Sequence, residues 1–420
     1  MTEGVDGDRK GGKHVVVLGG GMCGLYCART LAAAGVRVTV LEKMDRPGGL
    51  AATMECEGNF FDLGVKHLHA HDEEIFSDIQ GLMGERLLPV ALRAKIRFGN
   101  GFRQYPLKFF DLLTGIPPWT LAWILAGLGF QQMRNRFFPR SIENAEDALI
   151  ELYGEPLYRY FFRDFTHRYW GLPPTELSAT FVRRKMPRLG AVDLLKQGLS
   201  RFGLRAKQDT EVENALVDET LYYSEKGAIA IPEQFRQTIE GQGGKVVTSA
   251  AATRVVVENQ RVTAVEYERD GQTHSLNTDY VINTIPISRL IDALDEVPTD
   301  VVAAAARLRY RPLVVYGLVV NKPHVLDGLY IYYRERVFHR IAEPTQSGLR
   351  SSPPHHAVLL VEITCAEGDE MWRDTPSARE RVMADLAAEN LVERHQIVAM
   401  HQQKTLYGYP IFDLGFEPKL

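Results

Sequence analysis

The chain has 420 residues, a formal net charge of −4 and an apolar fraction of 45%. This length allows about two to three domains with substantial buried cores. The slightly acidic balance provides no basic field for nucleic acid, and the four scattered cysteines are typical of a reducing, cytoplasmic compartment. The polar residues 1–13 lack the apolar segment of a signal peptide.

The first predicted elements form a β–α–β unit. Residues 14–19 (HVVVLG) are a continuous, β-branched apolar run, which is typical of a buried parallel strand. A helix is predicted over 22–34, ended by Gly35, and a second strand over 37–42. The turn between the first strand and the helix, residues 19–24 (GGGMCG), satisfies the pattern G-x-G-x-x-G.

This glycine-rich turn, in that context, predicts a dinucleotide site. Gly19 permits the tight turn, Gly21 lets the backbone approach a pyrophosphate, and Gly24 lets the helix lie close to the strand. The helix N-terminus offers free N–H groups and its positive dipole end to the phosphates. Glu42, 18 positions after Gly24, can accept both ribose hydroxyls and would repel a 2′-phosphate. The alternative is a glycine-rich turn that binds nothing.

The middle of the chain has a helical pattern with many aromatic residues, over about 111–196. Within it, residues 115–130 are almost wholly apolar, yet shorter than the ~20 residues that span a bilayer. Trp119 and Trp123 lie one helical turn apart, and three arginines follow: Arg134, Arg136 and Arg140. A helix buried in a substrate domain is the favoured interpretation, and a helix lying in a membrane interface is the alternative.

Strand-like runs return in the second half of the chain. They occupy 245–248, 254–257, 262–268 and 280–284, with a predicted hairpin turn at Asp270-Gly271. Residues 312–340 alternate as in a sheet, and 376–394 form a charged amphipathic helix. Because helical material separates the opening unit from the strand at 280–284, we expect two domains that are interleaved along the chain.

The residues after Glu42 carry a resemblance to a known family. The stretches 46–53 (RPGGLAAT) and 61–64 (FDLG) resemble the flavin-containing amine-oxidase-like superfamily, whose members include protoporphyrinogen oxidase, phytoene desaturases and UDP-galactopyranose mutase. The resemblance implies an α/β fold in which a Rossmann-like FAD-binding domain of the GR2 type is interleaved with a mixed α+β substrate domain. The FAD-binding domain is expected at 12–65 and 222–290, with 405–420 returning to it. The substrate domain is expected at 66–221 and 291–404, with a helical insertion around 109–196.

The resemblance also implies the cofactor, FAD, and its contacts. Glu42 would bind the adenosine ribose, Arg46 and the paired glycines would approach the phosphates, and the backbone near Ala251 would contact adenine. The full set of expected FAD-binding residues is Gly19, Gly21, Met22, Cys23, Gly24, Glu42, Lys43, Arg46, Gly48, Gly49, Leu50, Ala51, Gly64, Ala251 and Thr284. The chain departs from the family pattern at Leu50, where the fuller motif has arginine. It also ends at Leu420, before the G-R-x-G-x-F-x-Y motif that follows segments like 407–415 in relatives.

Candidate catalytic residues lie in two later segments. Residues 61–69 (FDLGVKHLH) are similar to a mutase-like segment F-D-x-G-P-H-x-F-H, with His69 on its second histidine and Lys66 in place of the first. A cation at that place would stabilise an anionic reduced flavin. His67, His69 and His71 alternate, which is compatible with a metal site, but a polar loop is the favoured interpretation and no metal is expected.

The second segment is the alternating run 329–340. If the strand runs on, Tyr330, Tyr332, Arg334 and Arg340 share one face of it. Arginine suits phosphate or carboxylate recognition, and Arg340 matches a family arginine in that role. The candidate catalytic residues are therefore Lys66, His69, Tyr332 and Arg340. A solvated sheet face with packed tyrosines is the alternative.

Three functions remain open from the sequence. The favoured one is an FAD-dependent oxidoreductase (oxidase, dehydrogenase or desaturase) that passes a substrate hydride to flavin N5. The others are a non-redox isomerase similar to UDP-galactopyranose mutase and a flavin-poor, non-catalytic relative. We expect a small-molecule substrate that is hydrophobic or anionic, no nucleic acid partner, and a cytoplasmic protein with peripheral membrane contact through 115–130 as the open alternative.

Overall fold

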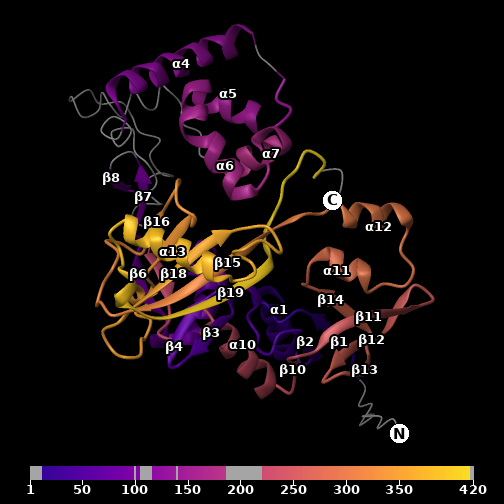
Figure 1. Ribbon diagram of the computed structural model, residues 1–420. Helices are drawn as coiled ribbons and strands as arrows, with labels where there is room; N and C mark the ends of the chain where they lie inside the picture. Colours follow the sequence, from indigo (N-terminus) through magenta and orange to yellow (C-terminus); the bar gives the residue numbers. More distant parts are fainter. Residues whose placement is uncertain (1–11, 99–100, 105–115, 139–140, 186–219, 417–420) are drawn as a thin grey trace. The chain divides into compact units, whose positions relative to one another are not determined.

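The computed structural model describes residues 12–98, 101–104, 116–138, 141–185 and 220–416 (Figure 1). The chain forms two compact units, and each unit is assembled from separate segments. The first unit consists of Met1–Thr53, Asp72–Arg86 and Lys226–Arg307. The second consists of Met54–His71, Leu87–Glu225 and Leu308–Leu420.

The first unit contains a parallel sheet of four strands. Their order is β10 (Lys245–Val247), β2 (Arg37–Leu41), β1 (His14–Leu18) and β14 (Tyr280–Asn283). Every residue of β1 is buried, which explains its continuous apolar sequence. Helices α1 (Met22–Ala33) and α10 (Ala230–Gly241) pack on this sheet and on each other, and α2 (Glu73–Met83) packs on α10. The predicted β–α–β unit is confirmed.

A second, antiparallel sheet completes the first unit. It is formed by β11 (Ala251–Glu258), β12 (Arg261–Arg269) and β13 (Gln272–Asn277). Asp270 and Gly271 both have positive φ, 51° and 73°, so the predicted hairpin turn between β12 and β13 is confirmed. Two short helices follow β14: α11 (Ile287–Asp292) and α12 (Thr299–Ala306).

The second unit is built on a mixed sheet of seven strands. Their order is β19 (Ile397–Pro410), β15 (Tyr310–Val320), β18 (Ala357–Thr364), β17 (Arg340–Ala342), β16 (Tyr330–Tyr332), β7 (Ala94–Phe98) and β8 (Gly101–Gln104). Helix α13 (Pro376–Ala388) packs against one face through Ala378, Val382 and Leu386. Phe61 and Leu63 pack against the other face, so the central strands β15 and β18 are buried on both sides.

Two small sheets and a group of helices make up the rest of the second unit. The small sheets pair β3 (Thr53–Cys56) with β4 (Asn59–Asp62), and β9 (Thr220–Tyr223) with both β5 (Leu68–His69) and β6 (Leu88–Ala91). The helices are α4 (Pro118–Phe137), α5 (Ala145–Leu157), α6 (Arg163–Trp170) and α7 (Ala179–Lys185), with a π-helical turn, Tyr158–Phe162, between α5 and α6. The predicted helical character of this region is therefore confirmed for the residues described.

Helix α4 differs from the favoured expectation of a buried helix. It packs on α5 along one side, and its buried residues are Ile124, Leu128 and Gln131. Trp119 is 75% exposed and Trp123 51% exposed. The buried interpretation was wrong because a run of apolar residues does not say how many neighbours surround a helix. No helix in the described ranges is both long enough and apolar enough to cross a membrane.

The predicted α/β class, with a parallel nucleotide-type sheet interleaved with a mixed unit, is confirmed. The boundaries of the units differ from the expected ones in five places, which include residues 222–225, now in the second unit, and residues 291–307, now in the first. Residues 72–86 belong to the first unit, because α2 packs on α10. Residues 54–65 and 405–416 belong to the second unit, where β19 pairs with β15 along its length.

Candidate functional site

The glycine-rich turn lies in the first unit, between β1 and α1. Gly19 has φ +100°, a value that favours glycine. A Cβ atom on Gly24 would lie 2.0 Å from the Gly19 carbonyl oxygen and 2.7 Å from Thr284 Oγ1. The Thr284 hydroxyl in turn donates to the Leu18 carbonyl oxygen at 2.8 Å. The turn is thus closed by backbone contacts that leave no room for side chains at these positions.

A second glycine loop lies against the first. The Gly48 N–H donates to the Gly20 carbonyl oxygen at 2.7 Å, and Gly49 Cα lies 3.9 Å from where a Gly21 Cβ would be. Gly48 and Gly49 both have positive φ, +119° and +56°. At Gly21, which precedes α1, no side chain of the described residues caps the first N–H groups. Two glycine loops without side chains thus lie beside the free N–H groups at the start of α1. This arrangement fits a pyrophosphate group.

Glu42 lies at the end of β2 and is buried. Its two carboxylate oxygens accept hydrogen bonds from the Gly20 N–H (2.7 Å) and the Met44 N–H (2.8 Å). The Ala250 N–H donates to the Glu42 carbonyl oxygen at 2.8 Å, so the segment that leads to Ala251 runs beside it. The backbone therefore fixes the orientation of this carboxylate next to the glycine-rich turn.

Arg46 lies in the loop that leads to Gly48. Its Nε atom is buried and has no hydrogen-bond partner among the described residues, and its Nη1 atom is 3.9 Å from Asp45 Oδ1. A buried, unpartnered N–H donor in this loop fits an anionic ligand such as a phosphate. The remaining expected FAD-binding residues around the two loops range from half-buried to exposed: Met22, Cys23, Lys43, Leu50 and Ala51.

Gly64, the remaining glycine of the expected set, lies in the second unit. It has φ +85°, and a Cβ atom there would lie 3.2 Å from the carboxylate of Glu362 on β18. Glu362 is fully buried and accepts hydrogen bonds from Arg340 Nε (2.8 Å), Arg340 Nη2 (2.7 Å) and the Val65 N–H (3.0 Å). The motif segment 61–66 thus wraps around a buried, bidentate ion pair.

Both members of this pair are charged at neutral pH. Burial acts to raise the pKa of Glu362, but the charge and hydrogen bonds of Arg340 outweigh it and lower that pKa to about 2. Burial likewise acts to lower the pKa of Arg340, and the Glu362 carboxylate more than compensates. The Glu362 carboxylate therefore balances the positive charge of the buried Arg340 guanidinium.

Tyr332, Arg340 and Glu362 form a row across three neighbouring strands. Tyr332 is directly opposite Arg340 between β16 and β17, and Arg340 is opposite Glu362 between β17 and β18. The guanidinium carbon of Arg340 lies 5.6 Å from the ring centre of Tyr332 and 5.8 Å from that of Tyr330. The strand does not run on over 329–340: β16 ends at Tyr332, and the chain reverses before β17. Arg334 points elsewhere and donates to the Tyr160 carbonyl oxygen at 2.9 Å.

Lys66 and the neighbouring histidines have distinct environments. The pKa of Lys66 is lowered, chiefly because burial penalises its charged form, while the nearby Glu362 acts in the opposite direction. Burial also lowers the pKa of His67 to about 4, and His67 Nε2 lies 2.8 Å from Ser347 Oγ. His69 is exposed and stacks on His71 at 5.0 Å. His67 is thus half-buried, whereas His69 is exposed. The described residues contain no group of three or more potential metal ligands.

The sequence reasoning missed Glu362 and His339. His339 is fully buried, its pKa is lowered to about 3 mainly by burial, and its Nε2 lies 3.8 Å from Glu362 Oε2. The ring of Tyr169, on α6, packs edge-on against His339 at 4.9 Å. A signal for Glu362 was present, because it is the single charged residue in the apolar strand 357–364 (AVLLVEIT).

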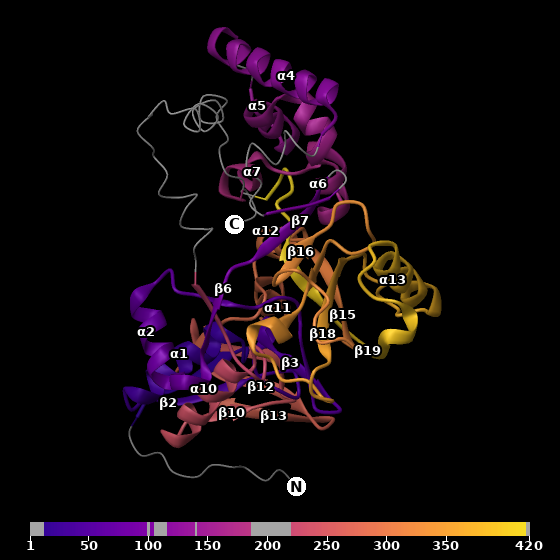
Figure 2. The ribbon, with the colours of Figure 1, turned by 90° about the vertical axis from the view of Figure 1, so that its left-hand side faces the viewer.

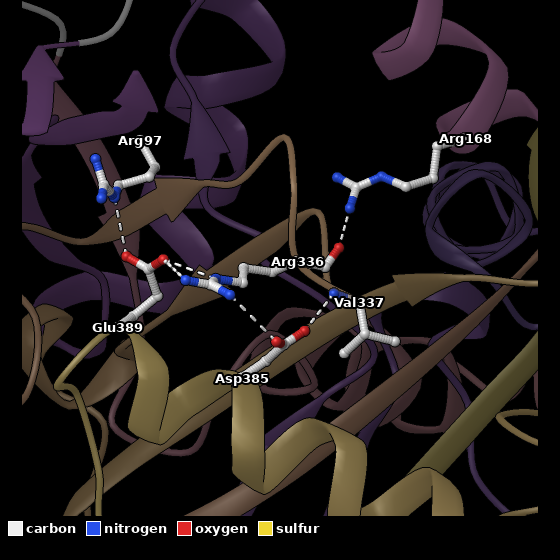
Figure 3. Close-up of polar contacts among 6 residues, drawn as sticks. All are labelled: Arg97, Arg168, Arg336, Val337, Asp385 and Glu389. Atoms are coloured by element: carbon white, nitrogen blue, oxygen red, sulfur yellow. Dashed lines mark hydrogen bonds and ion pairs between the residues drawn. The ribbon is translucent and has the colours of Figure 1, made fainter. Parts of the chain in front are cut away.

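A polar network holds the loop 333–339, which leads into Arg340 (Figure 3). Arg336 Nε donates to Glu389 at 2.7 Å, and Arg97 Nε donates to the same carboxylate at 3.0 Å. The Val337 N–H donates to Asp385 at 2.7 Å, and Arg168 donates to the carbonyl oxygens of Tyr333 and Arg336. These contacts tie the loop to α13, β7 and α6, and so position the start of β17.

Comparison with known proteins identifies the family. The sequence pattern described as flavin containing amine oxidoreductase matches residues 22–389. The chain belongs to this family. Phytoene dehydrogenase of Streptomyces griseus is 40% identical over 92 residues, which cover 21% of this chain and 18% of that protein. The dTDP-fucopyranose mutase of Escherichia coli is 22% identical over 239 residues, covering 51% and 61% of the two chains. The chain thus spans less than two thirds of the length of these curated relatives.

The fold of this family member also matches solved structures. A crystal structure of reduced UDP-galactopyranose mutase superposes with a TM-score of 0.79 and 18% identity, over 97% of this chain and 86% of that one. The likeness at this identity concerns the fold. The family is flavin-containing, and the cofactor is FAD, as predicted. The two glycine loops, Glu42 and Arg46 would hold its dinucleotide part.

Proposed function

We propose that this chain is an FAD-dependent oxidoreductase that oxidises a small organic substrate by hydride transfer. When bound, the flavin supplies a two-electron acceptor at N5. The residues of the second unit then have to bind and orient the substrate. The observation that carries the proposal is the bidentate ion pair between Arg340 and Glu362.

This ion pair bears on the kind of substrate. Glu362 occupies Arg340 Nε and Nη2 and offsets the positive charge of the guanidinium. Arg340 therefore attracts a phosphate or carboxylate of a substrate less strongly than an unpaired arginine would. Lys66 is the other cation of this cluster, and burial lowers its pKa. His67 and His339 are neutral at pH 7, since their pKa values are about 4 and about 3. An aromatic, nearly neutral site favours a substrate with little negative charge over a diphosphate.

A nearly neutral site suits oxidation of a C–H or C–N bond. Such a reaction requires orientation of the substrate and exclusion of water rather than a clamp for an anion. Tyr330 and Tyr332 flank Arg340, and the rings of Tyr409 and Tyr169 are tilted to each other with their centres 5.4 Å apart. Tyr409 and Tyr169 also interact electrostatically with Arg340 and Glu362, so aromatic surface lies beside the charged pair. The curated relatives that match short segments of this chain include a polyamine oxidase and phytoene desaturases, which are oxidoreductases by name.

The second candidate is a non-redox isomerase of the sugar-mutase kind. It is favoured by the dTDP-fucopyranose mutase match, which extends over half of this chain. Two residues that favoured the isomerase in the sequence analysis have environments in the structure that suit this role less well. His69 is exposed, and Arg340 is already neutralised by Glu362.

Anaerobic titration of the FAD-loaded protein distinguishes the two candidates. Putrescine, an L-amino acid mixture and detergent-dispersed phytoene are added separately, and the visible flavin absorbance is followed. We expect one class of donor to reduce the flavin, which lowers its visible absorbance. An electron-accepting dye added afterwards should reoxidise the flavin and restore that absorbance. The dithionite-reduced protein is incubated in parallel with UDP-galactopyranose and dTDP-fucopyranose. Sugar conversion by the reduced protein, without bleaching by any donor, would overturn the proposal in favour of the isomerase. Gly24→Ala protein, expected to lack flavin, is the control for both assays.

A further inference from the structure

Helix α4 carries an apolar stripe on its exposed side. The stripe residues recur at alternating spacings of four and three, which places them on one face of a helix. They are Trp119, Trp123, Ala126, Phe130, Met133 and Phe137. Trp119 is 75% exposed, Phe130 62% and Phe137 64%. A contiguous exposed apolar surface of this kind usually marks an interaction site.

The opposite side of α4 is packed closely against α5. Ile124 and Leu128 are buried there, and a Cβ atom on Gly127 would lie 2.2 Å from Pro156 Cγ. A Cβ atom on Gly154 of α5 would lie 3.1 Å from the Leu128 N atom. Figure 1 and Figure 2 both show α4 as the outermost of the helices α4 to α7. Helix α4 thus packs on α5 through the face opposite the stripe, and the stripe residues do not take part in that packing.

The chemistry around the stripe points to a lipid surface. The sequence has no aspartate or glutamate between Asp111 and Glu143. Arg134 and Arg136 lie in the last turn of α4, close to the end of the stripe. Aromatic side chains partition into the interface between headgroups and acyl chains, and arginines attract anionic headgroups. A helix that pairs with a second copy of itself would instead favour aliphatic residues along such a seam.

We propose that α4 is an interfacial helix that docks the second unit on an anionic lipid bilayer, with its stripe in the headgroup region and its axis parallel to the surface. A helix of 20 residues lying flat presents about 30 Å of length to the bilayer. Both arginines are then near enough to contact lipid phosphates. This inference concerns attachment and does not depend on which reaction the flavin supports.

Vesicle co-sedimentation tests the proposal on the FAD-loaded chain of 420 residues. The probes are phosphatidylcholine vesicles with and without phosphatidylglycerol. We expect binding to the anionic vesicles, a blue shift of tryptophan fluorescence on binding, and quenching by brominated acyl chains. Two of the four tryptophans of the chain, Trp119 and Trp123, lie in the stripe.

Two variants and a matched control separate the contribution of the apolar stripe to vesicle binding from that of the arginines. Trp119→Ser/Trp123→Ser/Phe130→Ser should lower the affinity for anionic vesicles by on the order of tenfold or more. Arg134→Gln/Arg136→Gln should remove the preference for phosphatidylglycerol, an effect on the order of tenfold. Val302→Ser/Val398→Ser removes two exposed apolar side chains outside α4, 46% and 57% exposed, and should bind as the native chain does.

Three outcomes would overturn the proposal. The first is no sedimentation with either vesicle. The second is binding that the triple serine variant retains. The third is a dimer, measured by light scattering, that the triple serine variant converts to monomer without any vesicle binding, because a second copy would then cover the stripe. Redox activity is measured on every variant and should be unchanged, so a failure of this proposal is distinct from a failure of the proposed function.

Discussion

Glu362 organises the second unit's candidate site at the level of single residues. Its carboxylate binds Arg340 and the Val65 N–H, and it lies beside His339 and the backbone of Gly64. Three separate segments of the chain, around residues 64–65, 339–340 and 362, therefore meet at one buried carboxylate. An isolated charge in such a place would be strongly unfavourable, so the ion pair with Arg340 is required for the carboxylate to stay ionised.

Replacing Glu362 tests this arrangement. Glu362→Gln leaves the Arg340 guanidinium buried without a counter-charge, and we expect a loss of about 3–5 kcal/mol in the free energy of unfolding at pH 7. The folded-state pKa of about 2 lies below the ordinary 4.5. The ionised carboxylate therefore contributes stability above about pH 4.5, and this contribution, on the order of 3 kcal/mol, is lost as the pH falls towards 2. Urea unfolding at a series of pH values measures both effects.

The difference between native and variant protein should narrow as the pH falls below about 4.5. Exposed Glu296 provides the control, and Glu296→Gln should leave both stability and its pH dependence unchanged. The double variant Arg340→Met/Glu362→Leu removes both charges and should be more stable than Glu362→Gln alone. A double variant as unstable as the single one would contradict charge compensation as the cause.

Gly24 is the residue on which the nucleotide turn depends most directly. In Gly24→Ala the new Cβ would lie 2.0 Å from the Gly19 carbonyl oxygen, so the turn has to open. We expect the purified variant to retain little FAD, measured as flavin absorbance per protein, while its secondary structure by circular dichroism is largely kept. Gly241→Ala, at a position with nothing within 4 Å, is the matched control and should bind FAD normally. Normal flavin content in Gly24→Ala would contradict the assignment of this turn.

Among the elements, the loop 333–339 and helix α13 show how a polar network positions a site. Glu389 at the end of α13 is 5% exposed and receives hydrogen bonds from Arg336 and Arg97 (Figure 3). Asp385, one turn earlier, accepts from the Val337 N–H. These contacts hold the loop that precedes Arg340, and so determine where β17 begins.

A pair of substitutions on α13 compares a buried with an exposed ion pair. Glu389→Gln weakens two arginine contacts in a mostly buried network, and we expect a loss of about 1–3 kcal/mol in the free energy of unfolding. Glu380→Gln removes the exposed pair with Arg394, whose side chains are 57% and 73% exposed, and should cost less than about 1 kcal/mol. Chemical denaturation measures both. Equal losses of unfolding free energy in the two variants would show that the network around Glu389 stabilises the loop 333–339 no more than an exposed ion pair would.

The elements also show where the local sequence pattern was enough to predict the structure. Asp270-Gly271 predicted the turn between β12 and β13, because both residues tolerate the positive φ that this hairpin requires. The alternation of 329–340 would have fitted one continuous strand, but β16 ends at Tyr332 and β17 begins at Arg340. The break after Tyr332 is stabilised by contacts with α13, β7 and α6, and no residue within the run indicates them.

At the scale of the whole molecule, each unit is assembled from three separate segments. The chain leaves the first unit at Thr53, returns for α2, leaves again, and returns for 226–307. The sequence predicted this interleaving from the distance between the opening unit and the strand at 280–284. It placed α2, within 66–221, in the substrate domain and residues 405–420, which include the end of β19, in the FAD-binding domain, whereas the structure has each in the other unit. The reason is that amphipathic patterns show that one face is buried and not what covers it.

The sequence by itself determined the β–α–β unit, the glycine-rich turn and the acidic residue at the end of β2, and hence a dinucleotide site; the family and FAD came from the resemblance carried by residues 46–53 and 61–64. These features depend on backbone geometry within about thirty neighbouring residues of a βαβ unit, which only glycines at set spacings allow. The tertiary structure alone decided that Glu362 neutralises Arg340, that His67 is half-buried while His69 is exposed, and that the apolar face of α4 is exposed. Each of these depends on which distant segments become neighbours, and burial and charge pairing follow from that contact rather than from local sequence.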